Sequence, residues 1–190
     1  MLNIDELKEM YPDIPLDIWQ MLRELDAFTY NHSIRVCEIC RLIERESCSP
    51  DSTLSEAGLL HDIGKYCYSQ KILGKHGGLN SLERDIIDAH AYLSYIILQH
   101  YHLPDEVCEI ALYHHRLKPT IFDNLISECA TDDITKQALI LKAVDVFEAL
   151  TTDRPYHRGI SNRKALDILR DMKCDETIIN ILADAKELER

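Results

Sequence analysis

The stretch LSEAGLLHDIGK, residues 54–65, places two residues that can bind metal at the end of an apolar helical pattern. Ala57 and His61 are four residues apart, so both lie on one face of a helix. Asp62 follows directly, and we expect Gly64 to end the helix. This helix is therefore predicted to carry an imidazole and a carboxylate into the interior.

Four other helical patterns direct a side chain that can bind metal onto an apolar face in the same way. In each of them the polar residue lies three or four positions from apolar ones; the four residues are His32, His90, His114 and Asp145. One such residue alone is more often a core group satisfied by hydrogen bonds. Five that converge on one core are most cheaply satisfied together by a divalent cation.

Two adjacent pairs, His61-Asp62 and His114-His115, strengthen this prediction. Neighbours on a helix point about 100° apart, so one pair can serve two metal ions, or a single ion where the helix frays. Gly58 lies four residues before Asp62, and we expect its missing side chain to leave room for a carboxylate that bridges two ions. Nitrogen and oxygen ligands without thiolate favour iron or manganese, with magnesium, nickel or zinc as further candidates.

The rest of the chain predicts helices throughout. Glycine and proline number only six each in 190 residues, and we find no alternating strand pattern. We expect an all-α bundle around the metal site, with residues 1–28 as an N-terminal helical extension and residues 29–190 as one domain. The expected helices lie near 15–28, 30–46, 53–63, 81–99, 104–115, 134–151, 161–172 and 175–188, and the expected loops at 48–53, 74–78, 118–124 and 153–159.

Composition excludes several classes of function. The net charge of −12 is unlike that of a protein that binds polymeric nucleic acid. No apolar run reaches the roughly 18–20 residues needed to span a membrane, so a cytoplasmic location is expected. Cys37 and Cys40 have the spacing of a zinc half-site, but they lie in a helical pattern without a second half-site, and we expect reduced thiols instead.

In order and spacing these motifs resemble the HD superfamily of metal-dependent phosphohydrolases, whose signature is similar to LLHDIGK (59–65). Within the superfamily the chain looks most like HD-GYP domains. The segments that carry this likeness are DAH (88–90), YHH (113–115) and AVDVFEALTTDRPYHRGIS (143–161), and the likeness extends over roughly residues 30–170.

The resemblance implies two metal positions that share Asp62 as a bridge. The first would use His32, His61, Asp62 and Asp145, and the second Asp62, His90, His114 and His115. It also implies that Lys65 lies beside the reacting phosphate and that Arg154 lies near the phosphates of the substrate.

Three segments depart from the HD-GYP pattern. RLKPTIFDN (116–124) stands where the family has a glycine-rich stretch ending in Gly-Tyr-Pro, and YCYSQ (66–70) replaces an apolar segment. Phe28 occupies the place where some relatives have a glutamate that holds a third metal ion. Two ions are therefore expected rather than three, with a changed substrate loop.

The expected function is hydrolysis of a phosphodiester or phosphomonoester in a small nucleotide by a hydroxide that bridges the two metals, with Asp62 and Lys65 as catalytic residues. Three alternatives stay open: cyclic di-GMP hydrolysis despite the changed loop, hydrolysis of a mononucleotide or a dinucleoside polyphosphate, and an idle metal-bound module that senses a nucleotide or a protein. The missing Gly-Tyr-Pro predicts that turnover of cyclic di-GMP is weak beside that of another phosphate ester.

Overall fold

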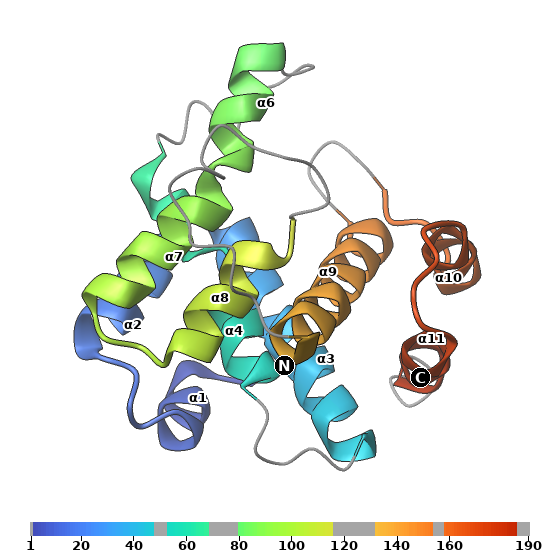
Figure 1. Cartoon of the computed structure of the whole chain (residues 1–190), viewed down its shortest axis with the longest axis horizontal. Coiled ribbons are helices and arrows are strands. Elements are labelled where there is room, and N and C mark those ends of the chain that lie inside the picture. Colours follow the sequence, from blue (N-terminus) through green and yellow to red (C-terminus); the bar gives the residue numbers. More distant parts are fainter. Residues whose placement is uncertain (1, 48–52, 69–79, 116–131, 154–157, 186–190) are drawn as a thin grey trace.

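The computed structural model describes residues 2–47, 53–68, 80–115, 132–153 and 158–185, and this part of the chain is helical without strands. Eleven helical elements follow one another in the described ranges (Figure 1). They are α1 (Ile4–Met10), α2 (Leu16–Glu24), α3 (Ala27–Glu46), α4 (Leu54–Leu60), the 3₁₀ helix η1 (Ile63–Cys67), α6 (Ser81–Asp88), α7 (His90–His100), α8 (Asp105–Tyr113), α9 (Asp132–Thr151), α10 (Asn162–Asp171) and α11 (Glu176–Ala185). The all-α prediction is confirmed.

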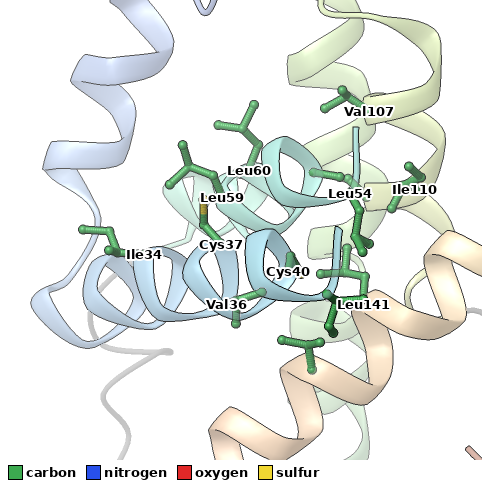
Figure 2. Packing of buried hydrophobic residues seen from close by; sticks show 14 of the residues in the cluster. Ile34, Val36, Cys37, Cys40, Leu54, Leu59, Leu60, Val107, Ile110 and Leu141 are labelled. Carbon is green, nitrogen blue, oxygen red and sulfur yellow. The ribbon is translucent and has the colours of Figure 1, made fainter. Parts of the chain in front are cut away.

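The centre of the bundle is the contact of α3 with α4, against which α8 and α9 pack (Figure 2). Val36 and Cys40 of α3 are fully buried, as are Ile110 of α8 and Leu141 of α9. Burying a large aliphatic side chain contributes about 1.5–3 kcal/mol, so this layer fixes the relative positions of four helices. Each of these helices, or the turn that follows it, also carries a predicted metal ligand.

Residues 1–28 contribute to the same hydrophobic core. Leu7 of α1 and Ile18, Trp19 and Leu22 of α2 are almost completely buried within one cluster with α3 and α4. The separation of an extension at 1–28 from a domain at 29–190 stays a prediction. The short helix α1 was not among the expected helices, although Asn3 and Glu6 form a capping box at its start.

Two helix boundaries in the structure differ from the predicted ones. The helix expected over 15–28 ends at Glu24, since Asp26 caps the next helix by accepting the N–H groups of Phe28 and Thr29. The helix expected over 81–99 is divided at Ala89, where ψ is −8°. There α6 leaves the direction of α7 and projects from the bundle (Figure 1).

The expected loops lie wholly or largely outside the described residues, and so does Arg154. The last residues of the helix expected over 175–188 also lie outside them. Among the described residues, no helix combines the length and the apolar character needed to cross a bilayer.

Candidate metal centre

His61 and Asp62 occupy the junction between α4 and η1, and both are about 1% exposed. The α-helix ends at Leu60, His61 keeps helical angles, and Asp62 has φ −99° and ψ 5°. Because the backbone leaves the α-helical path between them, the two side chains are not restricted to the orientations of helix neighbours. The junction brings both side chains into one buried space.

Ser94 of α7 holds this junction in place. Its hydroxyl donates to the carbonyl of His61 at 2.6 Å and accepts the N–H of Gly64 at 2.9 Å. Gly64 does not end the helix as expected, because α4 ends at Leu60 and Gly64 lies inside η1. Its role is close packing: a Cβ there would lie 2.2 Å from the carbonyl oxygen of His90.

Substituting Gly64 by alanine is expected to destabilise the protein by about 1–3 kcal/mol, because the new methyl group overlaps backbone atoms of α7. Gly58→Ala is the matched control. A Cβ on Gly58 would meet side-chain atoms of Cys40 at 3.1 Å and Val36 at 3.3 Å, so small shifts accommodate it. Equal urea midpoints for the two variants would contradict this assignment.

The contacts of Gly58 show that its role differs from the expected one. It faces Cys40 and Val36 of α3 and so permits close packing of α4 on α3. The expectation that it makes room for the carboxylate of Asp62 is wrong.

The carboxylate of Asp62 lies at the centre of the site. Its Oδ1 is 3.1 Å from Nε2 of His90, and its Oδ2 is 3.5 Å from Nε2 of His61 and 3.8 Å from Nε2 of His32. Lys65 donates from Nζ to Oδ2 at 2.6 Å. The two oxygens of Asp62 thus face different histidines, as a bridging ligand requires.

Asp145 of α9 supplies the second carboxylate. Its Oδ1 lies 3.0 Å from Nε2 of His32 and 4.0 Å from Nε2 of His61. Phe28 stacks on the imidazole of His32 with the ring centroids 6.2 Å apart. The place expected for a third-metal ligand therefore holds an aromatic ring packed against the site.

Three histidines are oriented by the same local hydrogen bond. In each, Nδ1 forms a hydrogen bond with the backbone carbonyl oxygen of the residue three positions earlier. The N···O distance is 2.8 Å for His61, 2.6 Å for His90 and 2.6 Å for His114. In a neutral imidazole this bond puts the proton on Nδ1 and leaves the lone pair on Nε2. All three Nε2 atoms are buried and have no hydrogen-bond partner in the described part of the chain.

The carboxylate oxygen Oδ1 of Asp62 is buried and without a hydrogen bond as well. It faces Nε2 of His90 at 3.1 Å, so with His90 neutral two acceptors oppose each other. Leaving such groups buried and unpartnered costs about 1–3 kcal/mol each. A divalent cation satisfies acceptors of this kind, and the donor set therefore fits a metal.

Three groups of potential ligand atoms lie within 4.8 Å of one another among the described residues. One is His32, His61 and Asp62, one is His90, His114 and His115, and one is His61, His114 and Asp145. The first two groups correspond to the two predicted positions, and the third group joins them. The structure thus brings together all seven predicted ligands, while His115 is the most exposed of them.

Electrostatics keep the carboxylates charged. Burial alone would raise the pKa of Asp62, but the ammonium of Lys65, in contact with its carboxylate, holds that pKa well below its usual range. Burial likewise opposes ionisation of Asp145, and His32, its hydrogen-bond partner, lowers the pKa of this carboxyl strongly. Both side chains are therefore carboxylates at neutral pH, the form that binds cations.

The histidines divide into two kinds. Burial lowers the pKa of His61 and the pKa of His114, which keeps both imidazoles neutral. Desolvation of the ring and the neighbouring His90 lower the pKa of His115 to about 4. At His32 burial acts in the same direction, but Asp145 and Glu148 outweigh it and raise the pKa to about 9. A cation bound at His32 must therefore displace a proton.

Sequence reasoning missed Glu148, Arg35 and Ser94. Glu148 of α9 is buried and contacts Nδ1 of His32 and Nε of Arg35. The spacing from Asp145 to Glu148 is one helical turn, which is the only sequence signal that could have indicated it. Ser94 lies one turn after His90 and carried no signal of its own, because serine is common on half-buried helix faces.

Comparisons with known proteins identify the family of this chain. The HD-domain family matches residues 29–150. A 3'3'-cGAMP-specific phosphodiesterase of Vibrio cholerae is 35% identical over 75% of this chain and 33% of its own length. A cyclic di-GMP phosphodiesterase of Pseudomonas aeruginosa is 31% identical over 76% of this chain and 36% of its own length. The chain spans about a third of the length of these curated relatives.

A solved structure shows the same fold. The HD domain of the phosphodiesterase PgpH from L. monocytogenes superposes with a TM-score of 0.66 at 18% identity, over 91% of this chain and 99% of that domain. The same domain in complex with cyclic-di-AMP gives a TM-score of 0.62 at 22% identity, over 91% of this chain and 94% of that domain. With its HD motif at the centre of this helical bundle, the chain belongs to the HD-domain family.

Proposed function

We propose that this chain is a metal-dependent phosphohydrolase that cleaves a phosphate ester bond in a small nucleotide. The observation that carries the proposal is the convergence of four buried acceptor atoms without partners among the described residues: Nε2 of His61, His90 and His114, and Oδ1 of Asp62. They come from three separate segments of the chain, so local structure alone does not account for their meeting.

Two divalent ions would be held at the two predicted positions, which share Asp62 as a bridge. His32, His61 and Asp145 would complete one position, and the second would use the histidines His90, His114 and His115. Iron or manganese suits this mixture of imidazole and carboxylate. When bound, such a pair lowers the pKa of a shared water and offsets charge on phosphoryl oxygens. The phenyl ring of Phe28 beside His32 supports two ions rather than three.

The chain's own residues would orient the substrate. Lys65 is on η1, its side chain is 21% exposed, and its ammonium lies at the edge of the buried cluster on Asp62. It would donate to a phosphoryl oxygen that gains charge in the transition state. Arg154 is the second residue proposed to bind phosphate, and it follows α9, which carries Asp145.

The proposed substrate class is a small nucleotide with a phosphate ester rather than polymeric nucleic acid. The net charge of −12 disfavours a polyanion, whereas metal ions can bind one or two phosphate groups locally. Relatives named for hydrolysis of 3'3'-cGAMP and cyclic di-GMP make cyclic dinucleotides the first class to test. Since RLKPTIFDN replaces the Gly-Tyr-Pro segment, we expect cyclic di-GMP to be turned over weakly beside another ester.

The test is a panel of nucleotides assayed with manganese-loaded protein. It contains cyclic di-GMP, 3'3'-cGAMP, cyclic di-AMP, their linear products, mononucleotides and dinucleoside polyphosphates, and it is run against chelated protein as a control. Turnover of at least one ester that stops after chelation is expected. Tight binding without turnover of any member, in protein that holds two ions, would instead identify a nucleotide-sensing module. A turnover number for cyclic di-GMP well above all others would reverse the expected ranking.

A further inference from the structure

Glu148 is a buried carboxylate to which the proposed hydrolysis assigns no role. It lies on α9 one turn after Asp145 and is 2% exposed. Its Oε2 contacts Nδ1 of His32, while its Oε1 accepts from Nε of Arg35 and, at 2.7 Å, from the hydroxyl of Thr152. Burying a carboxylate costs free energy of desolvation, so its place in the interior requires an explanation.

The position of His32 within its helix explains why a carboxylate is buried beside it. His61 and His114 directly follow the end of a helix, and His90 begins α7 two residues after the end of α6. Each Nδ1 atom lies within hydrogen-bond distance of a carbonyl group in the last turn of the preceding helix, that of Gly58, Ala111 or Ile87 respectively. Carbonyl groups in a last turn lack the usual helical partner and are free to accept.

His32 instead lies inside the long helix α3, Ala27–Glu46, where the backbone carbonyls are used by the helix itself. Its Nδ1 therefore has to find an acceptor on another element, and it finds Glu148 of α9. The other nitrogen of the ring, Nε2, faces Asp145 at 3.0 Å and Asp62 at 3.8 Å.

We propose that Glu148 is a positioning residue for the metal centre: by accepting the Nδ1–H of His32 it commits Nε2 of that ring to the first metal ion. The inference rests on the proposed metal-dependent function. Arg35 and Thr152 are the groups that keep the carboxylate turned toward His32.

Glu148→Gln changes this arrangement in a defined way at nearly constant shape. Arg35 can only donate, so it takes the amide oxygen of the glutamine and turns the NH₂ group toward His32. His32 must then accept at Nδ1 and carry its proton on Nε2, where it opposes a cation. Partners that fix a ligand in this way typically contribute 10–100-fold to metal affinity.

The experiment measures the zinc affinity and stoichiometry of the full chain by calorimetry, with NMR of ¹⁵N-labelled histidine in the zinc-loaded protein. Wild type should bind two ions and show a protected Nδ1–H for His32. Glu148→Gln should bind the first ion about 10–100-fold more weakly and lose that signal. Arg35→Met/Glu148→Gln should recover part of the affinity, because without Arg35 the amide oxygen can return to His32.

The outcomes are distinct. If Glu148→Gln binds both ions as tightly as wild type, the positioning role is overturned and the proposed function stands. If the double variant binds more weakly than Glu148→Gln, the role is structural only and the inference fails. If wild type binds no ion, the proposed metal-dependent function fails, and this inference fails with it. Should Glu148→Gln not fold, the double variant must bind more tightly than Glu148→Ala, and equal affinities overturn the proposal.

Discussion

Asp62→Ala is expected to lose both metal ions and, with them, the hydrolytic activity. The reason is geometric: the two oxygens of Asp62 face different histidines, with His90 on one side and His61 and His32 on the other. Removing this carboxylate takes a ligand from both positions at once and leaves the ammonium of Lys65 without its partner. Elemental analysis of protein purified without chelator measures the result.

Asp145→Ala is the matched control for this substitution. Asp145 also contacts His32 and His61, but it belongs to the first position alone, so its removal should cost one ion and leave the second. Circular dichroism must show that both variants are folded. Full occupancy in folded Asp62→Ala would mean that Asp62 is not the bridge.

Lys65→Ala is expected to lower kcat by about 10²–10³-fold while both ions stay bound, if the loss resembles removal of one preorganised donor. Its ammonium is at the rim of the site, where cations would repel it unless an anionic phosphate lay between them. The interaction is therefore favourable only with substrate present and becomes stronger as charge develops on the phosphoryl oxygens. Steady-state kinetics at saturating substrate and metal measure the effect.

Lys65→Arg keeps the positive charge but changes the shape of the donor group, so it tests whether kcat depends on the charge alone. The planar guanidinium cannot place a point charge at the same depth, so only partial recovery of kcat is expected. The structure also offers a second role, because Lys65 donates to Asp62 at 2.6 Å. A role confined to that ion pair would change metal affinity and stability but leave kcat of the loaded enzyme at the wild-type value.

The inward direction of the predicted ligands followed from sequence because helix periodicity is a strong signal. His32, His61, His90 and His114 recur at helical spacing with apolar residues, and the structure buries all four. A histidine on the buried face of a helix can be recognised from its neighbours in the chain. That these helices converge on one site was inferred from the cost of burying five such groups without partners. Which ligands share each metal ion came only from the family resemblance, since spacing within one helix says nothing about contacts between helices.

What sequence reasoning missed depends on contacts between distant segments. Glu148 meets His32 across 116 positions in the chain, and Ser94 meets His61 across 33. The role of Gly64 was misjudged for the same reason: glycine often ends a helix, whereas here the backbone of α7 approaches too closely for a Cβ. The division of residues 81–100 at Ala89 was missed because no glycine or proline marks it.

The dependence of hydrolysis on metal content tests the proposed function most directly. Chelated protein should be inactive toward the best substrate of the panel, and activity should rise with added manganese until two ions are bound per chain, with Asp62→Ala inactive throughout. Activity that survives complete removal of metal, or that reaches its maximum at one ion per chain, would contradict the proposed two-metal hydrolase.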